Sequence, residues 1–273
     1  MRNALPLPLF AALMTLVSIF GCDEGALDAN DMDIESGADD SNDIIPDLPD
    51  EQAALFEIAV HNKPALLNVD TFVSGTVPRY YEFNNANTEN PNGYYWCGHA
   101  ALKSVGKYIT GNTKSLSSLH NTFYQNSANY RADNYCPINS GQHWCAKLQD
   151  LMWAAQLAQN SGYGRGNSVV RNITRANNGV VNYVGFFDQV KGGANAGYPA
   201  IVPSNWKYAV GHFWIIVGYK DTGTATTSTL YVRDVALSEA AIPVSKYDWA
   251  VNVKTFVDAT QVGSANISML YVK

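Results

Sequence analysis

Tyr94-Tyr95-Trp96-Cys97-Gly98-His99-Ala100-Ala101-Leu102 is the stretch on which the interpretation of this sequence depends. Beyond Cys97, apolar residues recur at helical spacing until Gly111, a residue type that often ends a helix. We therefore predict a helix whose first turn holds Cys97. The unpaired amides and the positive dipole end of such a turn favour a thiolate, and the Cys97 amide can point at an oxyanion. Cys97 is thus a candidate nucleophile, although a buried structural cysteine before a helix follows the same pattern.

Three β-rich runs lie downstream, at residues 197–203, 211–219 and 230–234, with turn residues between them. His212 stands at the start of the second run and Asp234 at the end of the third. An antiparallel hairpin folded about Gly223 places these two residues opposite one another, with a register uncertain by about two residues. Asp221 is the other carboxylate that could pair with His212. It lies at the turn, so at strand rise it is roughly 30 Å from His212 and is excluded as a partner of His212 in the same hairpin.

These motifs, taken as an ordered set, resemble the peptidase C39-like family, a papain-like group of cysteine peptidases. The matching motifs are the Trp-Cys-Gly-x-Ala-Ala-Leu helix start, a Gly-x-Pro strand, a Gly-His strand ending in Gly-Tyr, and a later strand ending in Asp. The resemblance covers roughly residues 76–237. It implies an α+β, papain-like cysteine peptidase fold, in which an N-terminal nucleophile helix packs on an antiparallel sheet. It also implies that Cys97 is the nucleophile, His212 the general base and Asp234 the residue that orients the histidine.

The sequence departs from the family pattern at two positions. The family usually has proline two places after the cysteine, where this chain has His99. The family's oxyanion glutamine normally lies six residues before the cysteine, and that position is Pro91. Asn90 and Asn92 flank it, and either can donate an amide N–H. Asn92 is favoured because it lies nearer to the cysteine.

The function implied by the resemblance is hydrolysis of an amide bond in a peptide or protein substrate through a thioester on Cys97. This chemistry needs no cofactor and no metal. Three alternatives stay open. A papain-like cell-wall amidase or endopeptidase usually shows Cys-Ser-Gly at the nucleophile, whereas this chain shows Cys-Gly-His. An acyltransferase would use an amine in place of water. A non-catalytic binding protein that kept the fold is consistent with the missing glutamine.

The first residues are typical of an export signal. Arg2 is followed by an apolar run from Ala4 to Phe20, which is too short for a comfortable membrane span. The run ends in Ser18-Ile19-Phe20-Gly21-Cys22, which resembles a bacterial lipobox. We predict a lipoprotein signal peptide over residues 1–21 and a lipid on Cys22, so that the protein is exported to the bacterial cell envelope and anchored to a membrane. A plain secretory signal or an uncleaved anchor are the alternatives.

The acidic charge of the chain is concentrated in one segment. Half of its 24 acidic residues lie between Asp23 and Glu51, where there is no Lys or Arg. We predict a disordered acidic tether over residues 22–50, followed by one peptidase domain over residues 51–273. Seventeen of the 18 basic residues lie in that domain without forming a basic stripe, so nucleic acid is not expected as a partner.

Two further cysteines are predicted to form a disulfide. Cys136 and Cys145 are separated by a turn-rich loop, and an exported protein meets oxidising conditions. A zinc site that adds His143 to these two cysteines is the alternative. If Cys136 and Cys145 form the disulfide, Cys97 is left as a free thiol, as a nucleophile must be.

The remaining histidines are interpreted as structural or surface residues. His99 lies about 200° around the helix from Cys97, so its side chain points elsewhere. His61 and His120 stand in polar or loop-like surroundings.

Overall fold

The computed structural model describes residues 67–80, 95–112, 114–132, 145–156, 168–174, 182–207, 211–236, 246–260 and 266–272. The predicted signal peptide, lipid site, tether and domain start at residue 51 lie outside these ranges, as do Asn90, Asn92, Cys136 and His143. Within the described ranges, no helix combines the length and the apolar character needed to cross a membrane.

An antiparallel sheet forms the centre of the molecule, in the strand order β2-β7-β3-β4-β5-β6. Strand β4 is its central element, because it pairs with β3 and β5 and, near its C-terminal end, with the short strand β1. The three strands predicted downstream of Cys97 are confirmed as β3, β4 and β5. The strands span Asp70–Phe72 (β1), Val169–Thr174 (β2), Ala200–Ser204 (β3), His212–Lys220 (β4), Thr229–Asp234 (β5), Trp249–Asn252 (β6) and Asn266–Tyr271 (β7).

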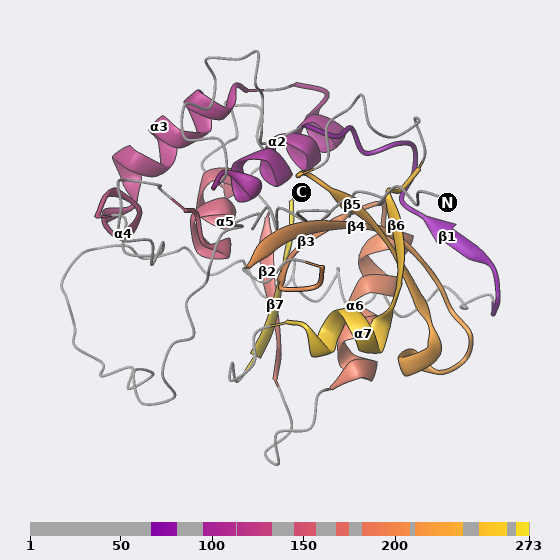
Figure 1. Cartoon of the computed structure of the whole chain (residues 1–273). Coiled ribbons are helices and arrows are strands. Elements are labelled where there is room, and N and C mark those ends of the chain that lie inside the picture. Colours follow the sequence, from indigo (N-terminus) through magenta and orange to yellow (C-terminus); the bar gives the residue numbers. More distant parts are fainter. Residues whose placement is uncertain are drawn as a thin grey trace, which may run out of the picture.

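The helices form two groups around this sheet (Figure 1). In that view α2, α3, α4 and α5 gather to one side, whereas α6 and α7 lie together below the strands. The helices and the strands give the chain an α+β architecture. The α-helices span Cys97–Thr110 (α2), Leu116–Asn126 (α3), Ala128–Arg131 (α4), Leu148–Gln156 (α5), Tyr183–Asn195 (α6) and Val253–Asp258 (α7), and Ala225–Thr227 forms the 3-10 turn η2.

Helix α2 begins and ends where the sequence predicts. Cys97 is its first residue, and Gly111 caps its C-terminus in the left-handed conformation, with φ of 76°. The helix packs closely on the sheet, because a Cβ atom added at Gly98 would lie 3.1 Å from Leu151 of α5 and 3.2 Å from the Phe213 ring of β4. The predicted packing of the helix that begins at Cys97 on an antiparallel sheet is therefore seen in the structure.

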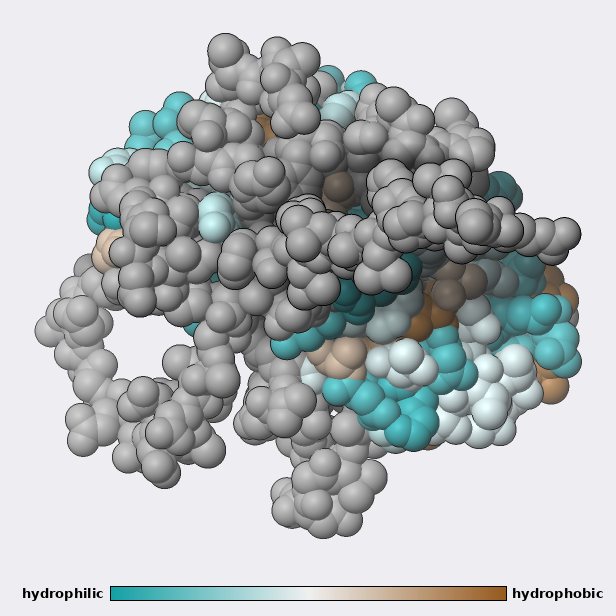
Figure 2. All heavy atoms as spheres, viewed as in Figure 1, coloured by the Kyte–Doolittle hydropathy of each residue, from teal (hydrophilic) through white to brown (hydrophobic). Residues whose placement is uncertain are grey.

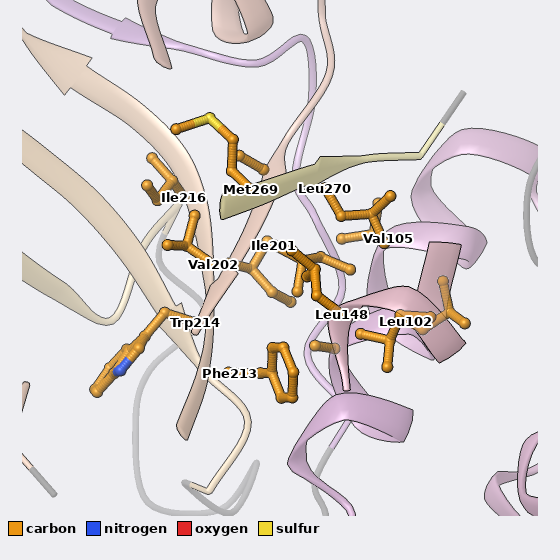
Figure 3. Close-up of a cluster of buried hydrophobic side chains, with 14 of the residues drawn as sticks. Leu102, Val105, Leu148, Ile201, Val202, Phe213, Trp214, Ile216, Met269 and Leu270 are labelled. Carbon is orange, nitrogen blue, oxygen red and sulfur yellow. The ribbon is translucent and has the colours of Figure 1, made fainter. Parts of the chain in front are cut away.

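The core lies on both faces of β4. Figure 3 shows Phe213 pointing toward α2 and Trp214 pointing the opposite way, as expected for neighbouring residues of a strand. The Trp214 ring lies 6.4 Å from that of Phe256 in α7, so a helix covers each face. Both faces of β4 are buried, which explains why its sequence reads as an apolar run without polar alternation. On the face seen in Figure 2, the visible described residues mix hydrophilic and apolar side chains.

The β4–β5 hairpin differs from the predicted register by two residues. Asp234 pairs with Trp214, and not with His212. The turn causes this offset, because Lys220 pairs with Thr229 around η2 and the hairpin is centred beyond Gly223. The bulge between Ile216 and Gly218 then shifts the register by one residue back toward the predicted one. His212 and Asp234 remain diagonal neighbours on one face of the sheet, since both share the face of Trp214.

Candidate active site

The N-terminus of α2 places Cys97 at the site. Trp96 precedes the helix without a side-chain cap, and its carbonyl accepts the Ala100 N–H at 2.9 Å. The first N–H groups of a helix have no partner within the helix. They and the helix dipole therefore favour negative charge on the Cys97 sulfur. Cys97 is not disulfide-bonded and is completely buried.

His212 and Asp234 form a buried pair at the ends of their strands. The distance from His212 Nε2 to Asp234 Oδ1 is 3.0 Å, and the side chains are 2% and 0% exposed. The same carboxylate oxygen accepts the Ala236 N–H at 2.9 Å. Because Asp234 occupies Nε2, the imidazole tautomer and ring orientation are fixed, and Nδ1 is the nitrogen left for another partner.

Cys97 is that partner, because its side chain hydrogen-bonds to His212. Burial alone would lower the pKa of His212. The hydrogen bonds to Asp234 and Cys97 and the charges of both groups outweigh burial and raise this pKa to about 9. At neutral pH the ring is therefore an imidazolium beside the sulfur. The structure thus brings together three of the four predicted site residues, whereas Asn92 lies outside the described residues.

A buried carboxylate that the sequence did not indicate lies behind Asp234. The side chain of Asp248 is 0% exposed, and its Oδ2 accepts the Asp234 backbone N–H at 2.9 Å. Its Oδ1 accepts hydrogen bonds from Arg79 Nη1 at 2.9 Å and from Arg233 Nη1 at 3.3 Å. Burial raises the pKa of Asp248, and the Asp234 amide and the two guanidinium groups counteract this. An isolated Asp before an edge strand carries no motif, so sequence patterns could not have found it.

An aromatic cluster holds the residue before Cys97. The Trp96 ring stacks with both His99 and His120, at centroid distances of 4.7 and 5.1 Å. His99 Nε2 and His120 Nδ1 each lie 2.8 Å from the Tyr130 hydroxyl. His99 is thus engaged away from the thiol and buried, as its position on the helix predicts. His120 is partly buried and also has a structural role.

Asp221 is excluded as a partner of His212, as predicted. Its Oδ1 accepts the Gly223 N–H at 2.8 Å, and its Oδ2 lies 3.3 Å from Lys191 Nζ. These contacts keep the Asp221 carboxylate in the turn at the far end of the β4–β5 hairpin.

The predicted disulfide is not tested by the described residues. Cys145 is buried, but Cys136 lies outside the described ranges, so the pairing of the two cysteines remains a prediction. Within those ranges, no group of three or more His, Cys, Asp or Glu side chains is arranged to hold a metal ion.

Comparison with known proteins adds one match. The model of a family described as the Peptidase_C39 like family matches residues 76–262, which is more than half of the chain. This range contains Cys97, His212 and Asp234. No curated protein sequence matches the chain.

Proposed function

The chain belongs to the peptidase C39-like family, and from this premise we propose that it is a cysteine peptidase of papain-like fold that cleaves a peptide bond through a thioester on Cys97. The observation that carries the proposal is the contact of one buried imidazole, that of His212, with both Cys97 and Asp234. A helix N-terminus at the sulfur and a histidine oriented by a carboxylate are the two devices that activate a thiol nucleophile.

Acylation begins with a thiolate on Cys97 and an imidazolium on His212. The sulfur attacks the carbonyl carbon of the scissile amide, and a C–S bond forms. The carbonyl oxygen takes up the negative charge, which the Cys97 backbone N–H and the side-chain amide of Asn92 stabilise. His212 then gives its proton to the amine nitrogen as the C–N bond breaks. The amine product leaves, and the acyl group remains on the sulfur as a thioester.

Deacylation reverses the direction of proton transfer. The neutral His212 takes a proton from water, whose oxygen attacks the thioester carbon. The C–S bond breaks and Cys97 leaves as a thiolate beside the imidazolium, so the starting state is restored. Asp234 stabilises the imidazolium in both halves of the cycle and keeps Nδ1 turned toward the sulfur.

We further propose that this peptidase acts in the cell envelope as a membrane-anchored lipoprotein. The lipobox-like end of the apolar run at Cys22 and the acidic segment behind it support this location. A charged tether would let the domain reach substrates some distance from the bilayer surface. The expected substrate is therefore a peptide or protein that is exposed in that compartment.

Incubation of the purified full chain with a mixed peptide library, followed by mass spectrometry, tests the activity. The wild type should produce cleaved peptides, whereas Cys97→Ala and His212→Ala should produce none above background. Asp221→Asn is the matched control, because it alters a buried carboxylate of the same hairpin away from Cys97, and it should cleave normally.

The same incubation distinguishes the alternatives. Cleavage of muropeptides but not of the library would point to a cell-wall enzyme. Products joined to an added amine would point to acyl transfer. If neither cleavage nor transfer occurs and Cys97 shows the reactivity of an ordinary thiol, the chain is a binding protein and the proposed function is wrong.

A further inference from the structure

Asp234 lies just beyond the end of the hydrogen-bonded ladder between β5 and β6. The last pair of the β5–β6 ladder joins Val232 to Trp249, so the Asp234 N–H lies one step beyond it. Asp248 takes over at this point. Its own N–H donates to the Val232 carbonyl at 2.9 Å, and its carboxylate accepts the Asp234 N–H at 2.9 Å. The backbone of Asp234 is thus held by a side chain where a strand would otherwise hold it.

The same carboxylate is linked to the helix that carries the nucleophile. Arg79 donates to Asp248 Oδ1 at 2.9 Å, and its side chain is 8% exposed. The next residue, Tyr80, donates its backbone N–H to Ser104 Oγ at 3.1 Å. Ser104 is a buried residue of α2 and donates to the Ala100 carbonyl at 2.8 Å. Two adjacent residues of one segment therefore connect the end of β5 to α2.

Taken in order, these contacts run from α2 through Tyr80, Arg79 and Asp248 to Asp234, and they avoid the histidine. His212 makes the second connection between the same two elements, because it contacts Cys97 and Asp234. A ring that must contact both groups depends on their separation, and a misplacement of about 1 Å can cost about 100-fold in rate. The connection through Tyr80, Arg79 and Asp248 fixes the separation of Cys97 and Asp234 whether or not the His212 ring is protonated.

We infer, on the basis of the proposed function, that Asp248 is a positioning residue that holds Asp234 at the distance from α2 at which His212 contacts both Asp234 and Cys97. Its charge is suited to this role. Arg79 and Arg233 both donate to the carboxylate, and a buried carboxylate with such partners is costly to disrupt. The hydrogen bonds of the Asp248 carboxylate go to Arg79, Arg233 and the Asp234 N–H, and not to Cys97 or His212, so Asp248 acts through Asp234.

The pH profile of Cys97 alkylation tests this inference without knowledge of the substrate. The full chain is treated with iodoacetamide, and modification is followed on the Cys97 peptide by mass spectrometry. In Asp248→Asn the amide oxygen can still accept the Asp234 N–H, but the amide NH2 cannot pair with two arginines. We expect alkylation at pH 6 to slow by about 10-fold or more, because the sulfur loses part of its imidazolium partner.

Asp248→Asn also changes the electrostatic surroundings of the charged groups near Asp248. Arg79 faces it from the segment before α2, and Arg233 and Asp234 face it from β5. Lys207 is a further charged group that interacts with Asp234. Asp221→Asn is the matched control, because Asp221 is also a buried carboxylate that binds a backbone N–H and a cation, at the far end of the same hairpin. It should leave the alkylation profile within about 2-fold of the wild type, since it is remote from the site.

Two other results would contradict the inference at different levels. If Asp248→Asn lowers the urea midpoint but keeps the wild-type alkylation profile, Asp248 is merely structural and the proposed function is unaffected. If the wild type itself alkylates like a free thiol and cleaves nothing, the proposed function fails and the inference fails with it.

Should Asp248→Asn not fold, Arg79→Gln breaks the connection to α2 and leaves Arg233 in place. An unchanged profile in Arg79→Gln would then refute the inference.

Discussion

The imidazole of His212 controls how the proposed activity should depend on pH. Its pKa is raised to about 9, so the ring carries its proton below that pH and loses it as the pH rises through it. The leaving amine needs this proton. The alkaline limb of kcat/KM should therefore lie near pH 9, well above the value of about 6.5 for a free histidine.

Asp234→Asn should move this limb toward lower pH. The substitution removes a negative charge that favours the imidazolium, and the shift should be about one to three pH units. Activity should fall by roughly 10²- to 10⁴-fold and yet remain measurable, because Cys97 and His212 are intact. A profile of kcat/KM against pH measures both effects. An unchanged limb at full activity would mean that Asp234 does not orient the ring.

His99 should make the fold less stable in acid. Burial and the nearby His120 hold the pKa of His99 well below 6.5, and its buried Nδ1 has no hydrogen-bond partner among the described residues. The unfolded chain therefore binds more protons below about pH 6.5, and stability falls as pH falls through this range. The loss between pH 7.5 and 5.5 should be about 1.4 kcal/mol for this group.

His99→Gln tests this expectation, because glutamine does not titrate and can still bond to Tyr130. Urea unfolding at the two pH values should show a smaller difference for the variant than for the wild type. His120→Gln is the comparison, since His120 is only half-buried and should contribute less. Equal pH dependence in the wild type and His99→Gln would show that the acid sensitivity arises elsewhere.

Among the strands, β1 depends on a glycine in β4. A Cβ atom at Gly218 would lie 2.5 Å from the Thr71 carbonyl oxygen, which is backbone and cannot rotate away. Gly218→Ala should therefore push β1 off the sheet and reduce the free energy of unfolding by about 1–3 kcal/mol. Lys220→Ala, two residues along the same strand, should cost less than about 0.5 kcal/mol. Equal urea midpoints for the two variants would contradict the close packing of β1.

For the chain as a whole, the N-terminal segment should decide where the activity is found. If Cys22 carries the lipid, the mature protein should partition into the detergent phase, because acyl chains bury strongly in a bilayer. Cys22→Ala should be released or remain as an unprocessed precursor. Mass spectrometry of the native N-terminus provides the check, and an unlipidated Cys22 would rule out the predicted anchor.

Local sequence patterns were enough to predict the nucleophile helix and the three strands that carry the site. Apolar spacing and Gly111 fix the extent of α2, and β-rich runs between turn residues fix β3, β4 and β5. These signals are local because they depend on which neighbouring residues face the core. The resemblance of these motifs, as an ordered set, to the peptidase C39-like family then indicated Cys97, His212 and Asp234 as candidates.

Contacts between segments that are distant in the chain could not be predicted from local sequence patterns. The bulge after Ile216 shifts the hairpin register by one residue, and the sequence carries no separate signal for it. Asp248 acquires its role only because the sheet brings Arg79 to it across 169 positions of the chain. Whether a buried carboxylate is tolerable depends on the partners that folding supplies, and these partners exist only in the folded molecule.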